Sequence, residues 1–247
     1  MEGSHSTNTL TILWVGAHAD DLEVLAGGTL AKYAKEGHNV YMAKVCTDDK
    51  GSLDVSSEEI VRIRTQEMKD AAEVLGATSL GNLGYPDSKV YLTDELVMRI
   101  MNLVREVKPD IVYTHYYKDY NPDHVAASQA TVWAVFNASN PTYRTDKPSH
   151  RVWRTIYADT VFGLDFDPDL WVDISDTIET KLRALGCYKS QIAMLEHFPG
   201  QSWTDVLENV RTCAAYRGLQ SGVKYAEAFK LVKKSGQNYA FQAPTLE

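Results

Sequence analysis

The stretch LTILWVGAHADDLEVLAGGTLAKYAKEG, residues 10–37, decides the fold class of this chain. It begins with an apolar run, Leu10 to Val15, that has the length and composition of a buried strand. A short turn follows, and residues 22–36 carry apolar side chains at helical spacing up to Gly37, which is suited to end a helix. A strand, a turn and a helix in this order are the repeating unit of α/β domains.

The same alternation continues along the chain. Further strands are predicted at 40–45, 80–83, 111–113, 156–161 and 171–174, and further helices at 57–75, 93–107, 123–137, 176–195 and 203–217. Residues 140–148, rich in Pro, Thr, Asp and Lys, predict a long surface loop. This order indicates a single Rossmann-like α/β domain in which helices flank a mostly parallel sheet. We expect the domain to span residues 10–247, after a flexible N-terminus of residues 1–9.

The composition argues against several classes of protein. The 247 residues carry a formal net charge of −8 with both signs mixed along the chain, which disfavours nucleic acid as a partner. No apolar stretch approaches the roughly 20 residues of a membrane span, and the first residues lack the apolar run of a signal peptide. We therefore expect a cytoplasmic protein. Three separated cysteines favour reduced thiols over a disulfide framework or a Cys-rich zinc site.

Polar residues with catalytic potential follow two of the predicted parallel strands. His18, Asp20 and Asp21 lie in the turn after the first strand, and His124 ends the loop after the strand 111–113. The carboxyl ends of parallel strands share one edge of the sheet, where such folds bind their ligands. We therefore expect the two loops to meet.

Two histidines and a carboxylate are the ligand set of a catalytic zinc site that keeps one position open. A divalent ion lowers the pKa of a bound water to about 7 and polarises a carbonyl, which suits hydrolysis of an amide. Asp20 and Asp21 are adjacent in a tight turn, so one of them is free to act as the general base. The alternative is structural: either aspartate, or Asn121 or Asp123 ahead of the later helix, is a common helix cap.

Several separated motifs of the chain form one set. They are His18-Ala19-Asp20-Asp21, Gly27-Gly28-Thr29, Thr47 to Gly51, Arg64-Thr65-Gln66-Glu67, Leu75-Gly76, Asp87 after Tyr85-Pro86, Pro122-Asp123-His124, Val172-Asp173-Ile174-Ser175, Lys181, Ser190-Gln191, Gly222 and Tyr225-Ala226-Glu227-Ala228-Phe229. This set resembles the PIG-L/LmbE-like zinc N-deacetylases, and it covers most of the chain.

The resemblance implies a site and a reaction. It implies His18, Asp21 and His124 as ligands of Zn²⁺, with another divalent metal as the alternative, and Asp20 as the general base. It further implies Arg64 and Asp87 as contacts to substrate hydroxyls. The implied reaction removes an N-acetyl group from an N-acetylglucosamine-type small molecule or glycoconjugate. Homo-oligomers are common in the family, so the resemblance also allows one here.

Two positions depart from the family pattern. Ala19 replaces the usual proline, which costs the turn some rigidity. Asn121 replaces a histidine thought to stabilise the oxyanion or to protonate the amine, and an amide can donate a hydrogen bond but cannot serve as an acid. We expect Asn121 to act in catalysis and His115 to line the substrate site. Either the metal and the protonated Asp20 carry all proton transfers, or another residue takes the place of the missing histidine, for which His115 and His197 are the candidates. Asp123 is expected to orient the imidazole of His124.

Three rival functions remain at this stage. One is an amidase that acts on a larger acyl group or a thiol conjugate, with specificity set by loops such as 140–150 and 196–203. Another is a sugar-binding homologue with impaired catalysis, for which Asn121 is the only support. A nucleotide-binding Rossmann domain is the weakest, because the turn after the first strand lacks the glycine-rich fingerprint.

Overall fold

Seven strands form one sheet in the computed structural model, which describes residues 9–233 except 196, 199 and 201. The strands are β1 (Thr11–Gly16), β2 (Asn39–Cys46), β3 (Thr78–Tyr85), β4 (Ile111–Thr114), β5 (Arg154–Ala158), β6 (Leu170–Asp173) and β7 (Ala226–Leu231). The helices are α1 (Asp21–Lys35), α2 (Ser57–Leu75), α3 (Asp94–Val107), α4 (Pro122–Ala138), α5 (Ile178–Leu185), α6 (Lys189–Leu195) and α7 (Trp203–Ser221). The predicted flexible N-terminus lies almost wholly outside the described residues.

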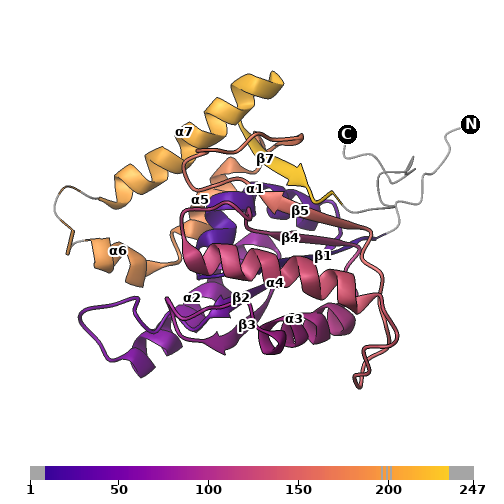
Figure 1. The fold of residues 1–247 in the computed structure, drawn as a ribbon. Helices are drawn as coiled ribbons and strands as arrows, with labels where there is room; N and C mark the ends of the chain where they lie inside the picture. Colours follow the sequence, from indigo (N-terminus) through magenta and orange to yellow (C-terminus); the bar gives the residue numbers. More distant parts are fainter. Residues whose placement is uncertain (1–8, 196, 199, 201, 234–247) are drawn as a thin grey trace, which may run out of the picture.

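The strand order β3-β2-β1-β4-β5-β7-β6 is that of a mostly parallel sheet (Figure 1). Strands β1 to β5 pair in parallel, and β7 lies antiparallel between β5 and β6. Parallel neighbours need crossover connections, and helices supply them here. The predicted α/β fold with a mostly parallel sheet is therefore confirmed.

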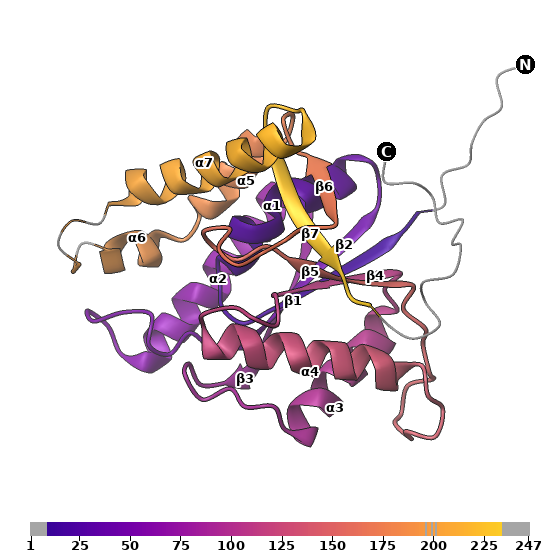
Figure 2. The same cartoon turned by 45° about the horizontal axis from the view of Figure 1, so that its top comes forward.

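Helices cover both faces of the sheet, and the residues of β1 show how. Ile12 and Trp14 pack on the side of α1, α2 and α5, whereas Leu13 and Val15 pack on the side of α3 and α4. Successive side chains of a strand point to opposite faces, so a strand between two helical layers reads as a continuous apolar run. Figure 2 shows α3 and α4 on one side and α1, α5 and α7 on the other.

The helix boundaries follow from local capping. Ser56 caps α2, because its hydroxyl accepts a hydrogen bond from the N–H of Glu59 (3.2 Å). Gly76 ends α2 in the left-handed conformation that glycine adopts without strain. The predicted helix 57–75 therefore has the bounds of α2, and the helices near 22–36, 93–107 and 123–137 differ from α1, α3 and α4 only at their ends.

The second half of the chain departs from the sequence-based prediction in three ways. The helix expected over 176–195 is two helices, α5 and α6, separated at Gly186–Tyr188. Tyr188 is fully buried there, and its hydroxyl donates to Glu23 (3.1 Å), which directs the chain away from a straight helix. Strand β5 ends at Ala158, three residues before the predicted end. Strand β7 was not predicted.

A buried ion pair fastens these later elements to α1. Glu227 on β7 accepts from the N–H groups of Gly28 (2.9 Å) and Thr29 (2.7 Å) and pairs with Lys181 on α5. The glycine pair of α1 lets its neighbours approach closely, since a Cβ at Gly28 would lie 2.8 Å from side-chain carbons of Ile174 after β6, and a Cβ at Gly27 would lie 3.3 Å from Cγ of Lys181 on α5. These contacts hold the middle of α1 against β7 and α5.

The predicted loop 140–148 has no helix or strand, as expected, and one buried arginine organises it. The Arg105 guanidinium donates to the carbonyl oxygens of Asn140 (2.9 Å) and Tyr143 (2.7 Å) and to Thr145 Oγ1 (2.9 Å). Its Nε also donates to the carbonyl of Ala138 at the end of α4 (3.2 Å).

Within residues 9–233, no helix has both the length and the apolar character required to cross a membrane.

Candidate metal centre

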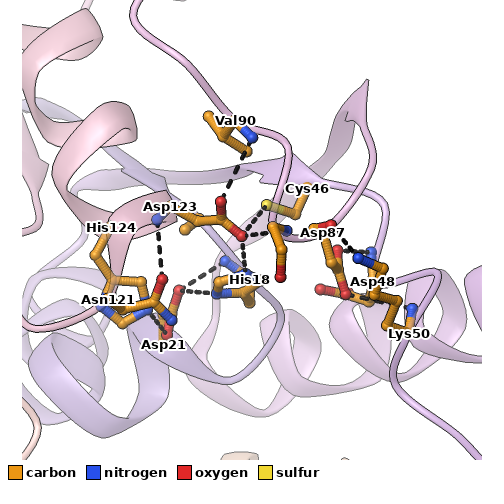
Figure 3. A network of polar contacts seen from close by, with 12 residues as sticks. His18, Asp21, Cys46, Asp48, Lys50, Asp87, Val90, Asn121, Asp123 and His124 are labelled. Carbon is orange, nitrogen blue, oxygen red and sulfur yellow. Dashed lines mark hydrogen bonds and ion pairs between the residues drawn. The ribbon is translucent and has the colours of Figure 1, made fainter.

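The candidate site lies where β1 and β4 diverge into their crossover helices. The chain leaves β1 for α1 on one face of the sheet and leaves β4 for α4 on the other, which makes this edge the switch point of the topology. His18, Asp21 and His124 meet there, and each offers a ligand atom within 4.8 Å of the others. Figure 3 shows the three side chains facing one another. The two loops thus meet as the sequence predicted.

Asp21 is the centre of this group. Its Oδ1 lies 3.2 Å from His124 Nε2, and its Oδ2 lies 3.6 Å from His18 Nδ1. The N–H of His18 also donates to Oδ2 (2.6 Å), so the turn itself holds the carboxylate in place. Asp21 and His124 are buried, while His18 remains partly exposed and provides access from solvent.

The donors present fit a divalent cation. His124 is 1% exposed, yet neither of its ring nitrogens makes a well-aligned hydrogen bond among the described residues, although each lies 3.2 Å from a carboxylate oxygen, of Asp21 or of Asp119. Buried polar atoms are rarely left unpaired, so such a nitrogen facing a carboxylate indicates an absent ligand. Burial alone would lower the pKa of His124, but Asp21 and Asp119 outweigh it and raise that pKa to about 9. The pocket therefore favours positive charge.

Two further carboxylates fix the histidine rings, and one corrects a prediction. Asp123 was expected to orient His124, but its Oδ2 lies 3.1 Å from Nε2 of His18. The N–H groups of Ser88 (2.7 Å) and Val90 (3.4 Å) hold Asp123 in that position. His18 is thus free to present Nδ1 to a cation. The reason for the error is that sequence adjacency on a helix does not bring side chains together.

The partner of His124 is Asp119, which was not singled out from the sequence. Asp119 Oδ1 lies 3.2 Å from His124 Nδ1 and accepts from the N–H of Asn121 (2.9 Å). His124 is therefore oriented to present Nε2. Metal-bound histidines usually have such a carboxylate on the other nitrogen. The one available signal was an acidic residue in the same loop, five positions before the ligand.

Asp20 does not cap α1, although it stands at the cap position. Its side chain makes no cap hydrogen bond, and its φ of 80° is left-handed, which a non-glycine residue adopts only under constraint. Asp48 and Ser88 also have positive φ, in the neighbouring loops after β2 and β3. Burial raises the pKa of Asp20 to about 7, although the charge of Arg64 acts in the opposite direction. These properties suit a proton acceptor.

The turn gains rigidity from a hydrogen bond that proline could not make. The N–H of Ala19 donates to Asp48 Oδ1 (3.2 Å), and Asp48 forms a buried ion pair with Lys44. The motif Thr47 to Gly51 was recognised in the sequence without a role for Asp48. The structure shows that this motif clamps the turn that carries His18, Asp20 and Asp21.

Asn121 caps α4, and this decides between the two residues considered for that position. Its Oδ1 accepts from the N–H of Asp123 (2.9 Å), so the amide oxygen is engaged. A backbone N–H can only donate, which fixes the orientation of the carboxamide and leaves its NH₂ group as a donor with no hydrogen bond to the described residues. Figure 3 shows Asn121 at the start of α4, where it bonds to Asp123, the residue before His124.

His115 does not line an open substrate site, which corrects the sequence-based expectation. Its side chain is fully buried, stacks on His124 with ring centroids 4.0 Å apart, and accepts from the N–H of Ala17 (2.9 Å). Burial lowers the pKa of His115 to about 4, and the neighbouring His124 acts in the same direction. A neutral, enclosed ring supports the metal ligands from behind and has no exposed atom for a substrate.

The two residues expected to contact substrate hydroxyls lie on separate elements, Arg64 on α2 and Asp87 in the loop after β3. Arg64 is buried, pairs with Gln191 on α6 and packs against Gly51, while its Nε has no partner among the described residues. Asp87 accepts from the N–H groups of Asp48 (2.9 Å) and Lys50 (3.4 Å) and so holds the loop after β2. His197, the other candidate acid, pairs with Asp54 (3.0 Å) on the surface.

Comparison with known proteins identifies the relatives of this chain. Residues 13–135 match the PIG-L family, described as GlcNAc-PI de-N-acetylase. A diacetylchitobiose deacetylase of Thermococcus kodakarensis is 31% identical over 229 residues, which cover 90% of this chain and 82% of the relative. A probable N-acetyl-alpha-D-glucosaminyl L-malate deacetylase of Bacillus cereus is 32% identical, covering 75% and 86%. A conserved protein of Thermus thermophilus has a similar structure, with a TM-score of 0.77, 28% identity and coverage of 94% and 100%.

Proposed function

Because this chain belongs to the PIG-L family, we propose that it is a zinc-dependent N-deacetylase. The proposed substrate is an N-acetylglucosamine-type small molecule or glycoconjugate, as the names of the relatives indicate for those proteins. One observation carries the proposal: His18, Asp21 and His124 converge at the switch point of the sheet, and the buried nitrogens of His124 face carboxylates without a well-aligned hydrogen bond among the described residues.

The metal ligands in this proposal are Nδ1 of His18, the carboxylate of Asp21 and Nε2 of His124. Bound there, a divalent ion lowers the pKa of water and polarises a carbonyl group. The chain keeps the ligands in position by three means: Asp123 holds His18, Asp119 holds His124, and the N–H of His18 holds Asp21. Two histidines with one carboxylate leave a coordination position open, which suits catalysis rather than a structural role.

Both proton transfers of the reaction are assigned to Asp20. Its carboxylate takes a proton from the attacking water and returns it to the departing amine, so one residue serves as base and then as acid. Asn121 donates a hydrogen bond from its NH₂ group to the oxyanion that forms on the acetamide oxygen. Asn121 does not transfer a proton, because an amide has none to give at neutral pH.

Recognition of the sugar is assigned to Arg64 and Asp87. Arg64 retains one free N–H at Nε among the described residues, and Asp87 lies half-buried between the loops after β2 and β3. Both also stabilise these loops, so their removal is expected to raise KM and to lower stability together. The loop positions 196, 199 and 201 lie outside the described residues and receive no role.

Acetate release from a panel of N-acetylglucosamine, its oligomers and its glycosides tests the function. The expected result is zinc-dependent release of acetate that a chelator abolishes and zinc restores. Release of larger acids in place of acetate would support the related amidase. A chain that binds stoichiometric zinc yet hydrolyses no acetamide would support the catalytically impaired homologue.

The Asp20→Asn variant tests the mechanism. We expect it to retain zinc and to lose activity by about 10²–10⁴-fold, which is the usual contribution of a general base. Asn keeps the size of the side chain and removes only its proton-accepting charge. Asp165→Asn, another aspartate with positive φ in a distant loop, is the matched control. Full activity in Asp20→Asn contradicts the assignment.

A further inference from the structure

Cys46 is a buried thiol beside the metal centre that the proposed reaction does not use. It ends β2, is 0% exposed, and its Sγ lies 3.9 Å from Asp123 Oδ2. That oxygen lies 3.1 Å from Nε2 of His18. Sulfur, oxygen and nitrogen thus come from β2, α4 and the β1–α1 turn, and they lie within 4.8 Å of one another (Figure 3).

We propose that Cys46, Asp123 and His18 form a second cation site, which selects soft, thiophilic ions such as Cd²⁺ and competes with the first centre for His18. The ligand spacing supports this site. Metal–ligand bonds of about 2.0–2.3 Å in a tetrahedral arrangement place the ligand atoms about 3–4 Å apart. The distances of 3.1 Å and 3.9 Å fall in that range.

The ligand types account for the expected selectivity. The first centre offers two imidazoles and a carboxylate, whereas the second replaces one imidazole by a sulfur ligand. Sulfur favours soft ions, and carboxylate favours hard ones. Backbone N–H groups of Ser88 and Val90 hold Asp123, so the oxygen of this site is already in position.

The two sites exclude each other because they share one imidazole. A neutral imidazole has a lone pair on only one nitrogen. In the first centre, Nδ1 of His18 binds the ion while Nε2 carries the proton and donates to Asp123. When a soft ion takes Nε2, that proton moves to Nδ1, which faces Asp21, and the Cys46 thiol loses its proton to solvent. His18 is then no longer a ligand of the first centre, and the enzyme is inhibited.

Titration of the metal-free chain with Cd²⁺ tests the site directly. We expect one thiolate-bound Cd²⁺ per chain, detected by the ultraviolet charge-transfer absorption of a cadmium–sulfur bond. Cys46→Ser should lose this absorption, and Cys213→Ser, which removes a half-buried thiol on α7, should keep it. Absorption that persists in Cys46→Ser, or that Cys213→Ser abolishes, overturns the proposal.

A second measurement needs no variant. The ¹¹³Cd NMR resonance of the unmodified chain at one equivalent is expected in the region of coordination by one sulfur with nitrogen and oxygen. A resonance of nitrogen and oxygen coordination alone overturns the proposal. Neither measurement depends on turnover, so both retain their meaning if the chain hydrolyses no acetamide.

Inhibition tests the competition for His18. For each protein the readout is the ratio of acetate release by the zinc-loaded chain with and without one equivalent of Cd²⁺. We expect the ratio to fall at least tenfold further in the unmodified chain than in Cys46→Ser. Equal ratios in the two proteins would show that the second site, if filled, does not withdraw His18.

Discussion

Two buried clusters of charged side chains flank α1, and they differ in one respect. In the cluster of Lys181 and Glu227, both carboxylate oxygens accept hydrogen bonds, and the ammonium also donates to the carbonyl of Val24. In the cluster around His124, buried atoms of His115, Asp119 and His124 itself make no well-aligned hydrogen bond among the described residues, although His124 lies 3.2 Å from two carboxylates. Buried polar groups are normally paired. The satisfied cluster is therefore complete as a structural element, while the other lacks a component.

Removing His124 should show the largest difference between the two clusters, because it should abolish zinc binding and activity. The His124→Ala chain should lose its zinc, and it should also lose some stability, because Asp21 and Asp119 lose the imidazole that lies 3.2 Å from each of them. Loss of a Lewis acid worth several kcal/mol should lower the activity by about 10³-fold or by a larger factor. Metal analysis and acetate release check this. His150→Ala, which removes a histidine bound to the carbonyl of Pro109, is the control and should retain zinc.

Breaking the satisfied cluster should affect stability instead. Lys181→Met leaves the Glu227 carboxylate buried without its counter-ion, which costs about 3–5 kcal/mol of the free energy of unfolding. Denaturant unfolding measures this. Arg99→Ala on the exposed pair with Glu95 is the control and should cost about 0–1 kcal/mol. A loss for Lys181→Met as small as that of the control would show that this cluster is not a structural fastening.

Zinc should stabilise the chain through the incomplete cluster alone. At a free concentration 100 times Kd, an ion that binds only the folded state adds about 2.7 kcal/mol to the free energy of unfolding. We expect this gain in the unmodified chain and in Lys181→Met, and none in Asp21→Asn. A gain that survives Asp21→Asn places the ion elsewhere.

The smallest expected change in stability comes from the turn between β1 and α1, which carries Ala19. Ala19→Pro removes the N–H that donates to Asp48, and a hydrogen bond to a charged group contributes about 1.5–3 kcal/mol. The stiffer backbone of proline returns about 0.4–1 kcal/mol, so we expect a net loss of about 1 kcal/mol in thermal or denaturant unfolding. A net gain in stability would show that the clamp by Asp48 contributes little.

Local pattern predicted the first half of the fold and the meeting of His18, Asp21 and His124. Strands β1 and β4 are apolar runs and β2 is interrupted by the buried Lys44, and parallel pairing brings their carboxyl ends to one edge. Strand β7 was missed because Glu227 interrupts its apolar pattern. A glutamate is read as a surface residue unless its buried partner is known, and Lys181 lies 46 positions away.

The supporting residues of the site could not be predicted for a related reason. Asp123 is adjacent to His124 in sequence, yet its partner is His18, 105 positions away. Asp48 contributes from a position with positive φ, and Asp119 from a turn in which its N–H donates to the carbonyl of Tyr116 (3.2 Å); no periodicity reveals either. The burial of His115 depends on the packing of α4 over β4, which is a property of the assembled layers.

The place of β7 in the sheet sets the order in which this protein is completed during synthesis. β7 lies between β5 and β6, yet it leaves the ribosome after both. Until residues 226–231 emerge, β5 has an open edge and β6 has no strand beside it, and such edges pair readily with other chains. A nascent chain that stalls before Ala226 is therefore prone to aggregate, and the arrival of Glu227 closes the sheet and locks α1 in a single step.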